Sequence, residues 1–217
     1  MMKKKTALLL CLIFAVCMLV TSCGSGGDSS NGNKTKSVFD TASEAYGEIS
    51  LAYEIVDEYG SAIYGAWMSG IYDDDEMDIE YLADETGIPE SELRAAFNSL
   101  YDGYKESTVF YLYRTNDDYS MFSLCVDLVT EAYLLNGKSE EAKTHLDNAK
   151  SIMRDMSENY SDYEHYTNLK GFYTKTNAFF DYCESPEGSF EQCKTTINDY
   201  RNQIRDFKND LDYIFEE

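Results

Sequence analysis

The ionisable side chains of this chain are numerous, but few of them are spaced as catalysis requires. The two histidines, His145 and His165, do not form a metal-binding pair in the sequence. The sequence has no GxSxG serine motif, no HExxH zinc motif and no glycine-rich phosphate loop. The chain of 217 residues has 40 acidic ones. Two carboxylates at a spacing suited to acid–base catalysis are therefore expected by chance and do not indicate an active site. We therefore predict no catalytic residue and no cofactor.

A run of acidic residues at 73–78 has the oxygen donors that calcium prefers. The candidate ligands are Asp73, Asp75 and Asp78. An EF-hand loop that began at Asp73 would need a glycine at its sixth position, where this chain has Asp78, and its fifth position would be Met77. We expect a solvated loop between helices, and a calcium site of another kind is the alternative.

Tyrosine is the most abundant aromatic residue, with nineteen copies against one tryptophan. Tyrosine provides rigid, amphipathic contact area at interfaces, and it also fills cores whose edges are wet. Because several tyrosines fall at helical seam spacing, we assign about half of them to the core. The candidates for an exposed binding face are Tyr101, Tyr104, Tyr163, His165 and Tyr166.

Residues 82–100, LADETGIPESELRAAFNSL, resemble a helix-turn-helix. Ala83 would allow two helices to approach, Gly87 would supply the turn and Leu93 would close the corner. DNA recognition needs donors and cations on the second helix, yet that helix begins Pro-Glu-Ser-Glu and has Arg94 as its only basic residue. We predict a packing corner, and no nucleic acid partner.

Apolar and small residues recur at alternating steps of three and four near both ends of the domain, which predicts two long helices that pack along each other. The first seam consists of Phe39, Ala42, Tyr46, Ile49, Tyr53, Val56, Gly60, Ile63, Trp67 and Gly70, and the second of Phe190, Cys193, Ile197, Tyr200, Ile204, Phe207, Leu211 and Ile214. Gly60 and Gly70 indicate close backbone approach. Ser189 and Gln192 form a capping box before the second seam.

Capping residues place the helices between these two seams. Asn116-Asp117 begins a helix that ends at Asn136-Gly137, and Ser139 begins another that runs to about Tyr160. Ser161 and Glu164 form a capping box at the start of a third helix, which ends near Cys183. Strand patterns are scarce. The sequence therefore predicts an all-α fold, an elongated antiparallel bundle of six to seven helices.

The N-terminus has the layout of an export signal, with Lys3, Lys4 and Lys5 before an apolar run at residues 7–20. This run is shorter than the roughly 20 residues that span a membrane. Val20-Thr21-Ser22-Cys23 resembles the lipobox of bacterial lipoproteins. The resemblance implies that residues 1–22 are removed and that Cys23 carries a diacylglycerol anchor on the outer face of the cell membrane.

Residues 23–37 contain mainly Gly, Ser, Asn, Thr and Lys, a composition typical of a flexible tether. The single helical domain is therefore expected at residues 38–217. Of the six cysteines, Cys11 and Cys17 would leave with the signal. Cys125 fits a core position. Cys183 and Cys193 flank a short turn, and they are either a disulfide or two buried thiols.

The formal charge of the chain is −22, and removal of the three signal lysines would make it −25. Such a field repels phosphate and anionic membranes and attracts cationic partners. Solubility alone is the other explanation of the charge.

We predict a membrane-anchored, non-enzymatic binding protein whose partner is a protein or a cationic peptide. One alternative is a carboxylate-dependent hydrolase of envelope or glycan substrates, which would need a deep cleft and one carboxylate with a raised pKa. Another is a spacer or scaffold of a surface assembly.

Overall fold

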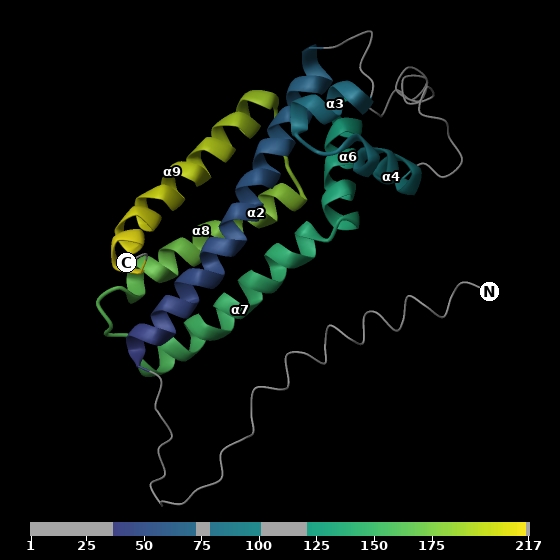
Figure 1. Ribbon diagram of the computed structural model, residues 1–217. Coiled ribbons are helices and arrows are strands. Elements are labelled where there is room, and N and C mark those ends of the chain that lie inside the picture. Colours follow the sequence, from purple (N-terminus) through teal and green to yellow (C-terminus); the bar gives the residue numbers. More distant parts are fainter. Residues whose placement is uncertain (1–36, 73–78, 101–120, 216–217) are drawn as a thin grey trace, which may run out of the picture. The chain divides into compact units, whose positions relative to one another are not determined.

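The computed structural model describes residues 37–72, 79–100 and 121–215, and every regular element in these ranges is an α-helix (Figure 1). The all-α prediction is therefore confirmed. The helices of the described ranges are α2 (Val38–Tyr72), α3 (Ile79–Thr86), α4 (Glu90–Leu100), α6 (Met121–Leu135), α7 (Lys138–Asn159), α8 (Tyr166–Glu184) and α9 (Phe190–Phe215). None of the helices in the described ranges is both long and apolar enough to cross a membrane.

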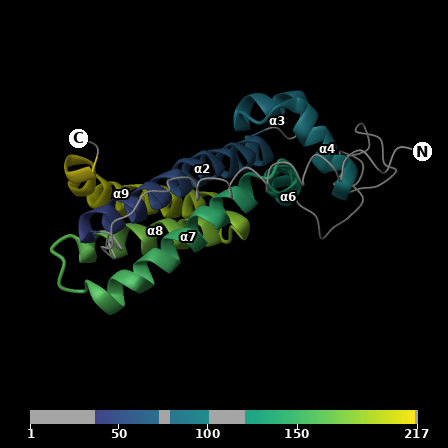
Figure 2. The same cartoon turned by 60° about the horizontal axis from the view of Figure 1, so that its bottom comes forward.

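Helix α2 is the centre of the bundle and packs against α3, α6, α7, α8 and α9 (Figures 1 and 2). The predicted seam faces this core, since Ile49, Val56 and Ile63 are fully buried. Three alanines on the same helix, Ala42, Ala45 and Ala52, are also fully buried. Small side chains of this kind let neighbouring helices lie close to the α2 backbone.

Helices α2, α7, α8 and α9 alternate in direction along the chain, since α7 runs opposite to α2 with Lys138 against Glu58 and His145 against Glu48. Contacts from α2 to α9 run in opposite order, because Tyr46 meets Asp212 and Ser61 meets Arg201. Contacts from α2 to α8 run in the same order, with Tyr46 against Phe172 and Val56 against Cys183. Helices α2 and α8 are therefore parallel neighbours, because α7 has returned the chain between them.

Helix α9 begins with the predicted capping box. The Ser189 backbone N–H donates to Gln192 Oε1 at 2.7 Å, and the Gln192 N–H donates to Ser189 Oγ at 3.4 Å. This arrangement satisfies two N–H groups that the first turn of a helix would otherwise leave unpaired. Ile197, Ile204 and Leu211 then form a buried stripe along α9. The second seam is confirmed, and it packs on both α8 and α2.

Two of the predicted helix starts are wrong. Helix α7 begins at Lys138, after Gly137 with φ +83°, so Ser139 lies inside the first turn and its hydroxyl donates to Glu184 Oε1 at 2.8 Å. Helix α8 begins only at Tyr166, and the side chain of its N-cap residue, His165, makes no capping hydrogen bond. The Ser161–Glu164 box does not form because this segment makes turns that pack Tyr163 and Tyr166 against the core.

The close approach predicted at Gly60 involves a ring and not the backbone. A Cβ at Gly60 would collide with the Phe179 ring on α8. Close backbone approach occurs instead at Gly65, where a Cβ would collide with the main-chain oxygen of Glu85 at the end of α3. Gly65 is outside the predicted seam, because it faces α3 and not the long helices. Glycine at this position lets α3 lie directly against α2.

Helix α6 ends at Leu135, directly before the predicted stop at Asn136-Gly137. Its predicted start at Asn116-Asp117 lies outside the described residues.

Candidate ligand-binding cleft

A cleft of about 540 Å³ lies where α2, the α3–α4 turn and the α6–α7 junction meet. Its volume is within the range of small-ligand sites, roughly 300–1,000 Å³. The lining residues come from three separate parts of the chain. They are Asp57, Glu58, Ser61, Thr86, Gly87, Ile88, Pro89, Glu92, Tyr133, Asn136 and Lys138.

One wall of the cleft is the corner that resembles a helix-turn-helix. Gly87 has a φ of +71°, which favours glycine, and its N–H donates to the Ala83 carbonyl at 2.9 Å. Ile88 is 5% exposed and Leu93 is fully buried, so both residues fix the turn to the core. Helix α4 then packs against α6. The corner is a packing device, as predicted, and its outer side forms part of the cleft.

Carboxylates dominate the polar lining of the cleft. Glu58 Oε2 lies 2.7 Å from Lys138 Nζ, and Glu92 Oε2 accepts a hydrogen bond from the Asn136 side-chain amide at 2.8 Å. Among the described residues that line the cleft, three are carboxylates and Lys138 is the one cation. The cleft therefore has a negative charge at its wall, which suits a cationic ligand.

The aromatic part of the cleft is Tyr133, which is 4% exposed. Its ring stacks on Tyr59 with centroids 4.1 Å apart and an interplanar angle of 7°. Lys138 Nζ lies over the ring, 5.6 Å from its centroid. Burial raises the pKa of the Tyr133 phenol, and the Glu58 carboxylate raises it further. A tyrosine is protonated at neutral pH even at its ordinary pKa of about 10, so the ring is neutral.

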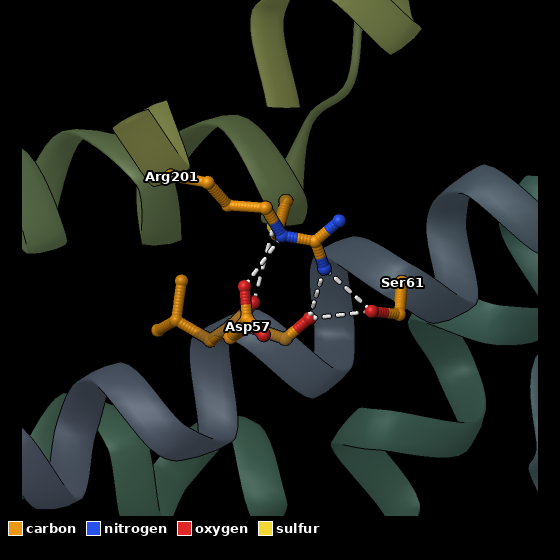
Figure 3. Close-up of polar contacts among 5 residues, drawn as sticks. Asp57, Ser61 and Arg201 are labelled. Carbon is orange, nitrogen blue, oxygen red and sulfur yellow. Dashed lines mark hydrogen bonds and ion pairs between the residues drawn. The ribbon is translucent and has the colours of Figure 1, made fainter. Parts of the chain in front are cut away.

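Asp57 belongs to a polar cluster that joins α9 to α2 (Figure 3). Arg201 Nε donates to Asp57 Oδ1 at 2.6 Å, and its terminal nitrogen donates to the Asp57 carbonyl at 3.0 Å and to Ser61 Oγ at 2.5 Å. Arg201 also lines a smaller cavity of about 220 Å³. Asp57 thus serves the packing of α9, which leaves Glu58 and Glu92 as the ligand-facing carboxylates.

The predicted binding face lies at the other end of α7, away from the cleft. Tyr163 and Tyr166 are partly buried against the core. The His165 ring lies between Tyr163 and Phe215, with centroid distances of 5.3 and 6.4 Å. The structure therefore brings these three residues together, but as a packed end of the bundle. The other two predicted members, Tyr101 and Tyr104, lie outside the described residues.

Cys125, Cys183 and Cys193 are buried free thiols, which corresponds to the second alternative for the Cys183–Cys193 pair. Burial raises the pKa of Cys125 to about 12 and raises the pKa values of Cys183 and Cys193 as well. Thiols in this environment are poor nucleophiles and poor metal ligands at neutral pH.

Within the described ranges, His, Cys, Asp and Glu residues form no group of three or more that could hold a metal ion. The calcium candidates Asp73, Asp75 and Asp78 lie outside these ranges.

Sequence reasoning missed the cleft residues Glu58, Glu92, Tyr133 and Lys138 as a group. The only local signals were the turn glycines at 87 and 137, which mark two of its walls. Comparisons with protein-family models, curated proteins and solved structures found no match for this chain.

Proposed function

We propose that this protein is an extracytoplasmic lipoprotein, anchored through Cys23, that binds a cationic peptide or protein segment without chemical conversion. The observation that carries the proposal is the cleft, which is lined by Glu58, by Glu92 and by the buried ring of Tyr133. Carboxylates and aromatic faces both attract ammonium and guanidinium groups.

The charge of the whole chain supports the same ligand class. A formal charge of −22 draws cations toward the protein from a distance, and the cleft then supplies short-range contacts. This division of roles is common, since long-range charge mainly raises the association rate while local contacts slow dissociation. An acidic surface without a cleft would account for solubility alone.

The accessibility of the carboxylates favours binding over hydrolysis. The Glu58 side chain is 63% exposed, and Glu92 already accepts a hydrogen bond from Asn136. A general acid for glycoside cleavage has to stay protonated at neutral pH, which usually requires burial among apolar groups. Neither carboxylate of the cleft has such an apolar enclosure. The cleft also favours a ligand-binding role over that of a spacer.

Replacing both ligand-facing carboxylates should weaken the binding of a lysine-rich peptide. For Glu58→Gln with Glu92→Gln, we expect the Kd of a decapeptide of alternating lysine and glycine to rise about threefold to tenfold at low salt, because rim charges contribute under about 1 kcal/mol each. Isothermal titration calorimetry on the full chain in detergent measures this change.

The matched control carries Glu158→Gln and Glu187→Gln, two exposed acids outside the cleft. Both double variants have the same net charge. An equal loss of affinity in the two would assign the binding to overall charge and contradict a site in the cleft.

A further inference from the structure

Lys138 has the same contacts that a bound cation would make. Its ammonium lies 2.7 Å from Glu58 Oε2 and over the ring of Tyr133, 5.6 Å from the centroid. Because Tyr59 covers one face of this ring, the ammonium lies on the face turned to the cleft. A carboxylate beside an aromatic face is a general cation-binding arrangement. The chain's own lysine therefore occupies the cation site of the cleft.

The position of Lys138 in its helix is one that the helix dipole does not favour for a lysine. It is the first residue of the helix, directly after the left-handed Gly137. The N-terminus of a helix carries a partial positive charge, so acidic residues are favoured there and a lysine is disfavoured. The rest of the first turn follows this preference with Glu140 and Glu141. The contacts with Glu58 and Tyr133, and not the helix dipole, favour a lysine at this position.

We infer that Lys138 is an internal occupant of a lysine-binding subsite, and that the ligand inserts an ammonium group between Glu58 and Tyr133 in its place. The inference rests on the proposed function, and it specifies which group of the ligand is recognised and where. The exchange is one ammonium for another, so the charge balance of the subsite is preserved and Glu58 is never left unpaired.

The exposure of the pair allows the exchange. The side chains of Lys138 and Glu58 are 43% and 63% exposed. Ion pairs with this much solvent contact are weak and screened by salt. A lysine stem is flexible, so Lys138 can turn to solvent without movement of the helix. Tyr133 is 4% exposed and held by Tyr59, so the aromatic face of the subsite stays in place during the exchange.

Removing Lys138 should therefore strengthen the binding of a lysine ligand. We expect Lys138→Ala to lower the Kd of the lysine–glycine decapeptide about threefold to tenfold, measured by calorimetry on the full chain in detergent. The matched control is Lys143→Ala, an exposed lysine of the same helix that does not line the cleft. It changes the net charge equally, and we expect it to lower the Kd less than twofold.

Two further binding measurements identify which group of the peptide is bound. A decapeptide with norleucine in place of lysine keeps the alkyl chain but lacks the ammonium, and it should show no gain from Lys138→Ala. Adding Glu58→Gln to Lys138→Ala should abolish the gain for the lysine peptide, because the carboxylate of the subsite is then missing.

The possible results separate the inference from the proposed function. Equal effects of Lys138→Ala and Lys143→Ala, or weaker binding by Lys138→Ala, would overturn the subsite while leaving the cleft's cation binding intact. A lysine peptide that binds neither the unmodified chain nor Lys138→Ala would instead overturn the proposed function.

Discussion

Replacing Phe179 with alanine is expected to lower the free energy of unfolding by about 3–5 kcal/mol, the usual loss for a large aromatic side chain in a core. The ring is fully buried and stacks on Tyr200 of α9, with centroids 5.3 Å apart and an interplanar angle of 17°. It also fills the space beside Gly60 of α2. Phe179 therefore joins three helices. Urea unfolding followed by circular dichroism measures the loss.

A double-variant cycle tests the contact between Phe179 and Gly60 directly. Gly60→Ala alone should cost about 1–3 kcal/mol, because the added methyl group collides with the fully buried Phe179 ring, which then has to shift. In a Phe179→Leu background the same change should cost clearly less, since the smaller side chain leaves space for it. Strictly additive free energies would mean that the two residues do not meet as described.

The second large effect concerns Gly65, where α2 meets the end of α3. Gly65→Ala is expected to destabilise the fold by about 1–3 kcal/mol, because the methyl group would collide with the main-chain oxygen of Glu85 and a backbone has no alternative rotamer. We expect this variant to separate α3 from α2 as well. Chemical denaturation followed by circular dichroism provides the free energy.

Gly47→Ala is the matched control in the same helix. Nothing lies within 4 Å of the Cβ that it would add. Alanine is preferred over glycine inside a helix by up to about 1 kcal/mol, so this variant should be more stable than the unmodified chain. Opposite signs at positions 47 and 65 are the expected pattern. Stabilisation by both alanines would contradict the close approach of α3 to α2.

The periodic parts of the fold could be predicted from the sequence. The seams of α2 and α9 repeat over many turns, and the Ser189–Gln192 box depends only on residues three apart. The starts of α7 and α8 could not, because tertiary contacts decided them. Ser139 bonds to Glu184 of another helix, and Tyr163 turns into the core where a capping box was expected.

The cleft could not be predicted from the sequence because its lining residues are far apart along the chain. Glu58 meets Lys138 from α7, and Glu92 meets Asn136, in each case through the packing of α2, α4 and α6 around a shared core. The exposure of tyrosines was equally unpredictable. Tyr163 and Tyr166 were predicted to form a binding face, yet both pack against the core. Tyr133, which was not a candidate, is the buried aromatic residue of the cleft.

The proposed anchoring through Cys23 would decide which partners the cleft can meet, so it is the claim to test first. Bacterial cells that express the protein should be grown with an alkyne-labelled fatty acid, which marks acylated proteins. We expect the unmodified chain to be labelled and recovered with the membrane fraction, and Cys23→Ala to be unlabelled. An unlabelled product in the cytosol with residues 1–22 still attached would contradict the assignment.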